Sequence, residues 1–378
     1  MFVDHNKLTC PLSGDESFEQ LFKIENHPIF MGVVDQEYNS EHADMVFHIN
    51  KNTGSVQIYP RVPLEKLYFK SHGSGKIGST WKNHHVEFYK FIAPFMTGNI
   101  IEIGGGHNSI HLYPTEENKN FKIYSFDPNG KKSANKQVKV INKFFSERHI
   151  KEEGIENISM FIHSHLFEHI YDPLNFLDAI HNNLNDDGFH IFAVPNMSKM
   201  IELNYANTMN FEHPFFLSED IIEHLLSMSG FKIIEKKYFQ DAHSIFYKTK
   251  KHDKTQKLFK NQYSSNRDKF MNLIKNWKND VIKINSEIKN HNGEIYIFGA
   301  HIFSQNLIFN GLDRSNIKYI LDNDPDKQNQ ILYGTNIEVK SPNIIKENKN
   351  PLIILRAAAY NDEIKEGIKS INQNSKFL

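Results

Sequence analysis

The sequence predicts an α/β protein with two parallel β-sheets, a larger one in the middle of the chain and a smaller one at its end. Short apolar segments of strand length alternate with segments of helical spacing from residue 84 to residue 247, and again after residue 290. Parallel strands need a crossover that is usually a helix, so this alternation is typical of a sheet covered by helices. With 378 residues, the chain is also too long for one ordinary core.

The expected elements begin with an irregular N-terminal lobe at 1–85, which covers the substrate. Turn residues separate its short strands, which are expected at 45–49 and 55–59. Residues 86–247 form the larger unit, with strands at 100–103, 122–126, 138–142, 159–163 and 189–194. Its helices are expected at 84–95, 173–183 and 218–229, and the last has Ser218 as N-cap and Gly230 beyond its end.

The second half of the chain is expected to connect and then repeat this architecture on a smaller scale. Residues 248–290 begin with a basic stretch at 248–254, interpreted as a solvated linker, and continue with an amphipathic helix at about 266–289. Residues 291–378 form the smaller unit, with strands at 294–300, 317–322 and 352–355. A cleft between two such units is a natural place for a ligand.

The composition excludes several classes of protein. Lys+Arg number 44 against 45 Asp+Glu, so there is no basic field for a nucleic acid polymer. One cysteine, Cys10, rules out an intrachain disulfide framework. No segment has the roughly 18 consecutive apolar residues of a membrane span, and the start lacks a signal sequence. We therefore expect a soluble cytoplasmic protein that does not bind membranes; the oligomeric state stays open.

The most informative segment is a glycine turn between two strands, Ile-Ile-Glu-Ile-Gly-Gly-Gly-His-Asn at 100–108. Glycines let the backbone approach a ligand where a Cβ would collide, and Asp127, at the end of the next strand, can accept both hydroxyls of a ribose. The pattern predicts a nucleoside-bearing cofactor, held by Glu102, Gly104, Gly106 and Asp127.

Two cofactors of this kind compete, because a dinucleotide site also has glycines after its first strand and an acid after its second. The acid inside the first strand, Glu102, is unusual for a dinucleotide, and a buried acid is costly without a partner. The Glu-x-Gly-x-Gly run instead resembles the first motif of class I S-adenosylmethionine methyltransferases, in which the acid holds the amino acid end of the cofactor. This resemblance implies S-adenosylmethionine.

Over nearly its full length, the chain resembles the C-methyltransferases that act on nucleotide-linked keto sugars. The resemblance is carried by Ile-Phe-Gly-Ala at 297–300, the segments 319–328 and 334–337, the linker helix, and Ser-His-Leu-Phe-Glu-His at 164–169. It implies an N-terminal metal-binding lobe, a class I methyltransferase Rossmann-like core and a C-terminal Rossmann-like lobe. Ser146 and His165 are then expected to line the cofactor pocket.

The segment Asn-Phe-Glu-His at 210–213 looks like the family's Tyr-x-Glu-His, in which the histidine is the base. Methylation at carbon requires loss of a proton beside a carbonyl, and an imidazole with a pKa near neutrality suits this step. We assign His213 as general base and Glu212 as the carboxylate that orients it. The same histidine can deprotonate a hydroxyl, so O-methylation of a sugar or phosphate-bearing group remains an alternative.

A glycine- and serine-rich stretch at 68–81 is expected to border the substrate as a lid. Its backbone amides, hydroxyls and ammonium groups can surround a phosphate. His301, after the glycine turn of the C-terminal unit, can reach the same cleft. The predicted substrate-binding residues are Tyr68, Lys70, Ser74, Lys76 and His301.

Two departures from the family pattern concern the metal and the acceptor. The family lobe holds zinc with four cysteines, whereas only Cys10 is present here; a structural zinc needs four thiolate or imidazole ligands. His163, His165 and His169 have no recognised metal spacing, so we predict no metal. Asn210 replaces the family tyrosine, which puts the keto-sugar substrate in question.

The favoured function is methylation of a nucleotide-linked or phosphorylated sugar, for surface polysaccharide biosynthesis. Two other classes stay open: an NAD-dependent oxidoreductase built on two Rossmann-like units, which Glu102 disfavours, and an inactive binding module, to which Cys10 and Asn210 point.

Overall fold

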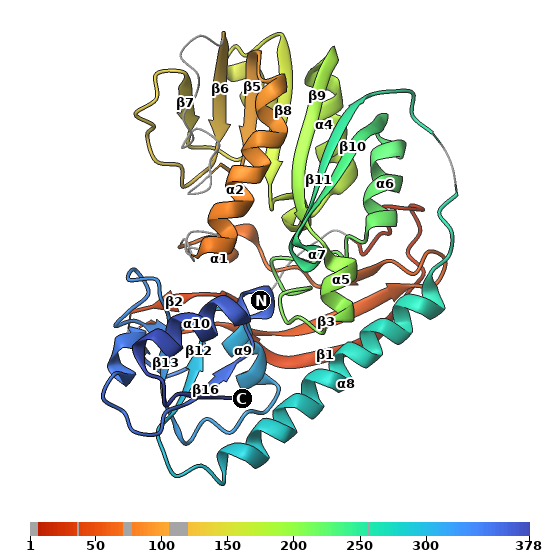
Figure 1. Cartoon of the computed structure of the whole chain (residues 1–378). Coiled ribbons are helices and arrows are strands. Elements are labelled where there is room, and N and C mark those ends of the chain that lie inside the picture. The colour runs from red at the N-terminus through yellow and green to blue at the C-terminus, as the bar shows by residue number, and fades with distance from the viewer. Residues whose placement is uncertain (1–6, 36–37, 71–77, 106–119, 256–257) are drawn as a thin grey trace.

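The computed structural model describes residues 7–35, 38–70, 78–105, 120–255 and 258–378. Figure 1 shows the larger sheet in one half of the molecule and the smaller C-terminal sheet in the other, with a long helix running along one side. Strands β1 and β3 of the N-terminal lobe lie between the two halves. None of the helices in these residue ranges combines the length and the apolar character that a membrane span needs.

The larger sheet contains seven strands within the described ranges, in the order β10-β11-β9-β8-β5-β6-β7. Its strands are β5 (Gly98–Ile103), β6 (Phe121–Phe126), β7 (Val138–Ile141), β8 (Ile158–Ser164), β9 (Leu184–Pro195), β10 (Phe231–Phe239) and β11 (Ser244–Lys251). The five strands from β5 to β9 pair in parallel, whereas β11 is antiparallel to both β9 and β10. The sequence analysis predicted the parallel strands but not the β10–β11 hairpin.

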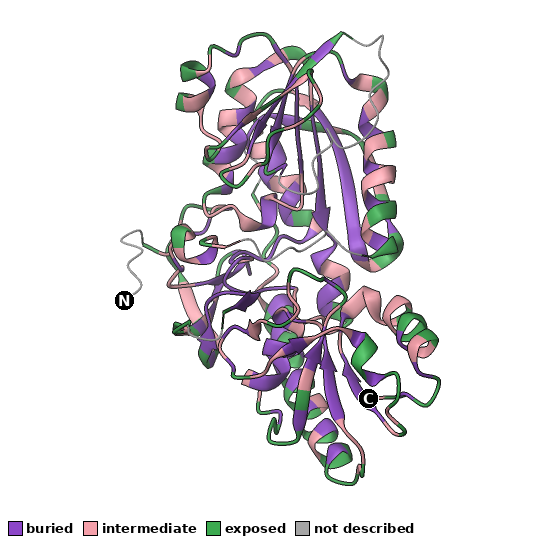
Figure 2. Cartoon of the chain, turned by 90° about the vertical axis from the view of Figure 1, so that its left-hand side faces the viewer, coloured by how far each residue is buried: buried purple, intermediate pink, exposed green. Residues whose placement is uncertain are grey.

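Helices cover this sheet on its outer faces. They are α2 (Ser79–Ile92), α3 (Glu147–Glu152), α4 (Pro173–Asn183), α5 (Met197–Glu202), α6 (Glu219–Met228) and α7 (Gln240–His243), with short 3-10 turns at Ala93–Phe95 and Phe167–His169. Figure 2 shows buried strands inside and exposed residues on the outward faces of the helices. Helix α4 has the predicted bounds, and Asp172 caps it by accepting the Asn175 N–H. Helix α6 ends before Gly230, whose φ of 78° is typical of a residue beyond a helix C-cap.

The basic stretch predicted as a linker at 248–254 belongs in part to the sheet, because β11 runs to Lys251. Lys248 is buried: its ammonium group lies 4.1 Å from the centroid of the Phe95 ring and 2.5 Å from a Glu235 carboxylate oxygen. A lysine can bury its aliphatic stem in this way while its charge is paired, so charge alone did not mark the end of the domain. The predicted boundary at 247/248 therefore lies inside a strand; the four-part division itself stays a prediction.

The N-terminal lobe is an antiparallel sheet that connects both units. Its strands are β1 (Phe18–Pro28), β3 (His42–Asn50) and β4 (Val56–Ile58), in the order β1-β3-β4, and helix α1 (Leu64–Leu67) follows. Strand β2 (Val33–Val34) pairs with β14 (Ile331–Leu332) of the C-terminal unit. In addition, Gln57 bridges to Phe215 of the central unit. The lobe is therefore held on two sides by backbone hydrogen bonds.

The C-terminal unit is a parallel sheet in the order β15-β13-β12-β16-β17. Its elements are β12 (Ile295–Phe298), α9 (Ile302–Phe309), β13 (Ile317–Leu321), β15 (Val339–Lys340), the 3-10 turn Pro342–Ile345, β16 (Leu352–Leu355), the 3-10 turn Ala358–Tyr360, α10 (Asn361–Ile371) and β17 (Lys376–Phe377). Helix α8 (Tyr263–Ile288) precedes it and buries one apolar face against the core. Arg356 forms two hydrogen bonds to the Asp280 carboxylate of α8, at 2.6 and 2.7 Å.

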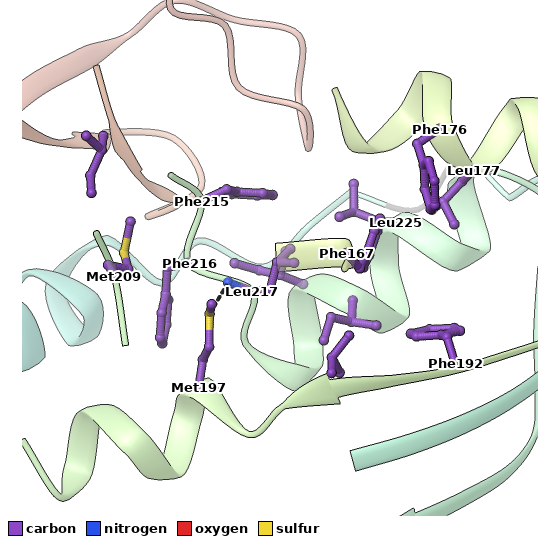
Figure 3. Close-up of a cluster of buried hydrophobic side chains, with 14 of the residues drawn as sticks. Phe167, Phe176, Leu177, Phe192, Met197, Met209, Phe215, Phe216, Leu217 and Leu225 are labelled. Carbon is purple, nitrogen blue, oxygen red and sulfur yellow. Dashed lines mark hydrogen bonds between the residues drawn. The ribbon is translucent and has the colours of Figure 1, made fainter. Parts of the chain in front are cut away.

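A continuous apolar core joins the N-terminal lobe, the central unit and α8. Part of it is drawn in Figure 3, where side chains of the segment 209–217 lie among those of α4, β9 and α6. Phe216 packs edge-on against Phe270 of α8 at 5.1 Å, and the Leu217 N–H donates to the Met197 sulfur at 3.2 Å. The segment that carries Glu212 and His213 is thus anchored on both sides by buried residues.

Candidate active site

A cavity of about 560 Å³ lies where the three lobes meet. Its walls include the carboxyl ends of β5, β6 and β8, part of the N-terminal lobe, and the first turns after β12 and β16. The chain runs from β5 through β6 to the edge strand β7 and then returns to β8 on the other side of β5, so the strand order reverses beside β5. Ligands of open parallel sheets bind at this kind of switch point, beyond the carboxyl ends of the strands.

The glycine turn after β5 forms one end of the cavity. Gly104 has a φ of 71°, and its N–H donates to the Phe126 carbonyl at 2.8 Å, which holds the turn beside the end of β6. A Cβ on Gly104 would lie 3.0 Å from Leu166 Cδ1. Both Gly104 and Gly105 line the cavity, so the backbone is open to a ligand there. Gly106 lies outside the described residues.

Both predicted carboxylates also line the cavity. Glu102 is buried within β5, where it is paired in register with Ser125 of β6 and Ile162 of β8. Asp127 follows β6 directly, is partly exposed, and accepts the Asn129 N–H at 2.7 Å. The structure therefore brings together Glu102, Gly104 and Asp127 in the arrangement on which the cofactor prediction depends.

Ser146, which the resemblance assigns to the cofactor pocket, lies at the start of helix α3. It caps helix α3 by accepting the His149 N–H at 3.2 Å, and it is not among the described residues that line the cavity. The cavity wall in this region consists of Phe144 and Phe145. Because the serine hydroxyl is used by the helix terminus, the aromatic residues before it are the ones that can contact a ligand.

His165 lines the cavity directly after β8, in a left-handed conformation with a φ of 50°. Such a conformation is uncommon for a residue with a Cβ, and it turns the side chain away from the path of the strand. Its Nε2 lies 2.8 Å from Ser244 Oγ, and its Nδ1 lies 3.4 Å from Glu168 Oε1. Burial, together with a smaller effect of the nearby His85, lowers the pKa of His165 to about 3, so the ring is neutral at pH 7.

Five titratable side chains from three parts of the fold meet on one wall of the cavity: Tyr68, Glu168, His169, Glu212 and His213, here called the acid–base cluster. The Tyr68 hydroxyl lies 2.9 Å from His169 Nδ1, and the same nitrogen lies 3.8 Å from Glu212 Oε2. The rings of His169 and His213 are 4.7 Å apart, edge to face. Burial raises the pKa of Tyr68, and the charge of Glu212 raises it further, so the phenol stays protonated.

The position of His213 fixes its tautomer. Its Nδ1 lies 3.0 Å from the Asn207 carbonyl oxygen, which can only accept, so Nδ1 carries the proton and Nε2 has the lone pair. Burial lowers the pKa of His213, although the charges of Glu168 and Glu212 partly oppose this. The ring is therefore neutral at pH 7 and able to accept a proton.

Glu168 is the second unusual group of the cluster. It is buried, and its Oε2 has no hydrogen-bond partner among the described residues. Burial raises the pKa of Glu168 to about 7, against the opposing effect of His213. A carboxyl group with a raised pKa beside a neutral imidazole is an arrangement suited to proton transfer.

Asn210 shapes the turn that presents the cluster. Its Oδ1 accepts the backbone N–H groups of Glu212 at 2.8 Å and His213 at 3.1 Å, which fixes the direction of both side chains. Its Nδ2 is buried without a hydrogen-bond partner among the described residues, and Asn210 lines the cavity. The residue that departs from the family pattern thus supports the turn and leaves a donor available.

Three of the five predicted substrate-binding residues have a place in the described structure. Tyr68, Lys70 and His301 line the cavity, whereas Ser74 and Lys76 lie outside the described residues. Lys70 donates to the neutral Gln330 amide oxygen at 2.6 Å, across the junction between the N-terminal lobe and the C-terminal unit.

The carboxylate after β13, Asp322, is used within the C-terminal unit. It accepts the Ala300 N–H at 2.8 Å and lies 3.6 Å from Lys327 Nζ. In a dinucleotide site the acid at this position binds a ribose. These contacts speak against the two-unit oxidoreductase alternative.

Sequence spacing did not assign Glu168, His169 or His243 to the site. Glu168 and His169 belong to the segment that carries the resemblance, and the signal for a role in the site is the Glu-His pair itself, directly after a strand of the sheet. His243 precedes β11, a strand that was not expected, so nothing in the sequence placed it near the cavity.

Comparison with known families identifies both units. A methyltransferase domain family matches residues 82–236, and the C-methyltransferase C-terminal domain family matches residues 243–378. The larger sheet, with its antiparallel β11, has the class I methyltransferase fold that the sequence predicts, which is confirmed. No curated protein matches the chain.

Several solved structures are similar to part of the chain. A protein from Listeria monocytogenes, assigned to the S-adenosylmethionine-dependent methyltransferases, is 13% identical over 46% of this chain and 100% of its own, with a TM-score of 0.37. The N-methyltransferase NodS from Bradyrhizobium japonicum WM9 is 11% identical over 47% of this chain and 98% of its own, with a TM-score of 0.33. At such low identities and TM-scores, these likenesses say nothing of the acceptor.

Proposed function

We propose that this enzyme, an S-adenosylmethionine-dependent methyltransferase with the C-terminal domain of C-methyltransferases, methylates a carbon atom of a nucleotide-linked keto sugar. The observation that carries the proposal is the acid–base cluster, which lines the same cavity as the glycine turn after β5. A base beside the methyl donor is what carbon methylation requires, because the acceptor carbon must first lose a proton. We place this reaction in surface polysaccharide biosynthesis.

In this proposal the cofactor lies over the carboxyl ends of β5 and β6. Glu102 binds the amino acid end of S-adenosylmethionine, and Asp127 accepts hydrogen bonds from the ribose hydroxyls. Gly104 and Gly106 let the protein backbone approach the cofactor. His165 contacts the cofactor from the end of β8. The support is that Glu102, Gly104, Asp127 and His165 line one cavity.

His213 acts as the general base. Its Nε2 accepts the proton from the carbon beside the acceptor's carbonyl group, while its Nδ1 keeps its hydrogen bond to the Asn207 carbonyl. The nearby carboxylates of Glu168 and Glu212 then stabilise the imidazolium, since both raise the pKa of His213 by their charge. Glu212 thus assists His213 electrostatically, and the Asn207 carbonyl orients the ring.

The negative charge that develops on the acceptor's carbonyl oxygen needs a donor in a site from which water is excluded. Asn210 Nδ2 is such a donor, because it is buried, lines the cavity and has no partner among the described residues. The protonated Tyr68 hydroxyl is a second donor in the tautomer in which His169 Nδ1 carries the proton, because the hydroxyl then accepts from His169 and its own O–H is left for the acceptor. This pair takes the part that the resemblance assigns to a tyrosine at position 210.

The enolate carbon then attacks the methyl group on the sulfonium. A carbon–carbon bond forms as the sulfur–carbon bond breaks, the sulfur keeps the bonding electrons, and S-adenosylhomocysteine leaves. The proton stays on His213 until the site opens to solvent. The protein contributes mainly alignment of the two reactants within about 3–3.5 Å and exclusion of water.

The C-terminal unit and the N-terminal lobe are proposed to hold the nucleotide part of the acceptor. The hydrogen-bond partner of Lys70 is the neutral Gln330 amide, so the charge of Lys70 can attract a phosphate. His301 lines the cavity at the start of α9. Ser74 and Lys76 complete this proposed set.

A hydrogen-exchange experiment tests the base separately from methyl transfer. The enzyme is incubated in D₂O with nucleotide-linked keto sugars and S-adenosylhomocysteine, and deuterium at the carbon beside the carbonyl is followed by NMR. Exchange is expected with the wild type and should fall by about 10²- to 10⁴-fold in His213→Gln. His224→Gln, a change of another histidine with a buried Nε2 that lacks a described partner, is the matched control. Equal exchange in His213→Gln and the control would remove His213 as base.

A further inference from the structure

Three histidines from distant parts of the chain converge beside the cavity. His84 comes from α2, His165 follows β8, and His243 is the last residue of α7. One ring nitrogen of each lies within 4.8 Å of those of the other two. The ring centroids are 5.1, 5.2 and 5.7 Å apart, which makes the triangle nearly equilateral.

His84 is the member whose position is hardest to explain by packing alone. Its side chain is fully buried, and Nε2 has no hydrogen-bond partner among the described residues. Its ring contacts the phenylalanine rings of Phe88, Phe239 and Phe246, with centroids 5.3 to 6.2 Å away. A buried ring nitrogen without a partner is destabilising, and a bound cation would satisfy it.

The neighbours of the other two histidines orient their rings. Glu168 Oε1 lies 3.4 Å from His165 Nδ1, so the carboxylate favours the tautomer in which Nε2 keeps its lone pair. Histidine ligands of metals usually have such a carboxylate on their second nitrogen. Ser244 Oγ lies 2.8 Å from His165 Nε2 and 2.6 Å from His243 Nδ1, between the two rings.

We propose that His84, His165 and His243 bind one divalent transition-metal ion of the Zn²⁺ type at the wall of the cavity. Three imidazoles with a fourth position left open are an arrangement found in catalytic zinc sites. Zn–N bonds of about 2.0–2.1 Å place tetrahedral nitrogens roughly 3.3 Å apart. The distance between any two of these nitrogens therefore shortens by at most about 1.5 Å on binding.

The open position of this ion faces the cavity. His165 and His243 line the cavity, whereas His84 lies behind them, so the side opposite His84 is the accessible one. An oxygen of a bound ligand is the group that would occupy it. The inference stands whichever acceptor the enzyme methylates, because it depends on the three histidines alone.

Metal binding is tested with the full chain, produced without a histidine tag and freed of metal by a chelator. Calorimetric titration with ZnCl₂ is expected to give one ion per chain. His84→Gln, His165→Gln and His243→Gln should each weaken binding by more than the 10- to 100-fold that outer-shell changes cost, and Glu168→Gln by about that 10- to 100-fold. His224→Gln should bind Zn²⁺ like the wild type.

Two further readouts separate loss of the site from loss of the fold. Circular dichroism verifies that each variant is folded, and Zn²⁺ should raise the unfolding temperature of the wild type but not that of the three variants. The acid–base cluster also offers three possible ligands, Glu168, His169 and His213. Unchanged Zn²⁺ affinity in folded His84→Gln and His243→Gln, or loss of the ion in His213→Gln instead, would overturn the proposal. Neither readout depends on turnover, so a failed function proposal leaves it intact.

Discussion

Replacing Gly104 by alanine tests whether the glycine turn after β5 is the place where the backbone meets the cofactor. Gly104 has a φ of 71°, in the left-handed region, where a residue with a Cβ loses roughly 1–2 kcal/mol. The new methyl group would lie 3.0 Å from Leu166 Cδ1, the flexible end of a side chain that can shift by a few tenths of an ångström. We therefore expect Gly104→Ala to lower the free energy of unfolding by about 1–2 kcal/mol and to stay folded.

The effect on the cofactor should be larger than this strain implies. The added methyl lies against Leu166, and both Gly104 and Leu166 line the cavity, so the affinity for S-adenosylmethionine is expected to fall at least about tenfold, which is 1.4 kcal/mol. Gly154→Ala is the matched control: Gly154 has a φ of 63°, and its Cβ would meet no heavy atom within 4 Å. The left-handed backbone at Gly154 should cost Gly154→Ala the same stability, but Gly154 is not among the described residues that line the cavity.

Urea denaturation and calorimetric titration with S-adenosylmethionine measure the two quantities separately. Both variants should lose similar stability, and only Gly104→Ala should lose cofactor affinity. Wild-type affinity in Gly104→Ala, or an equal loss in Gly154→Ala, would refute the placement of the cofactor at this turn.

Three further changes have expected outcomes. Asp127→Asn should weaken S-adenosylmethionine binding by about tenfold or more, through loss of a charged acceptor for the ribose, whereas unchanged binding in the titration would exclude that contact. Gly54→Ala should destabilise the fold by more than about 2 kcal/mol in urea, because its φ is 76° and its Cβ would lie 2.4 Å from backbone atoms of Gln262 and Tyr263; a midpoint like that of Gly154→Ala would contradict this. Burial lowers the pKa of His27 from 6.5 to about 4. Between these pH values His27 is protonated in the unfolded chain but not in the folded protein, so the free energy of unfolding decreases as the pH is lowered. In denaturation curves at pH 6.5 and 4, His27→Leu should lose about 3 kcal/mol less than the wild type, and equal losses would show that His27 titrates normally.

The parallel strands could be predicted from the sequence because their pattern is local. Buried parallel strands are short apolar runs, and the helices between them have clear starts, such as Asp172 before α4. The β10–β11 hairpin was missed because its strands carry many charges: Lys248 looks like a solvated residue in the sequence but is buried over Phe95. The charge of Lys248 is neutralised by Glu235 only because β10 and β11 pair, and no local sequence pattern predicts that pairing.

For the candidate site, the sequence indicated which residue types take part but not which of them are in contact. Glu102, Gly104 and Asp127 follow from spacing along two adjacent strands, and the structure brings them to one cavity. The contact between Tyr68 and His169 joins the N-terminal lobe to the end of β8, so it depends on how the lobes pack.

The convergence of His84 and His243 depends on packing in the same way. It becomes visible only after α2, α7 and β8 are assembled around the cavity. The sequence-based prediction that the chain binds no metal depended on the single cysteine and on the spacing of histidines along the sequence, and neither of these shows the triangle.

The most direct test of the central claim is the position of the transferred methyl group. The enzyme is incubated with methyl-labelled S-adenosylmethionine and nucleotide-linked keto sugars, and the product is analysed by mass spectrometry and NMR. The proposed mechanism predicts a methyl group bonded to the carbon beside the carbonyl, formed in equal amount with S-adenosylhomocysteine. A methyl ether on a sugar oxygen, or no methylated sugar from any of these acceptors, would contradict it.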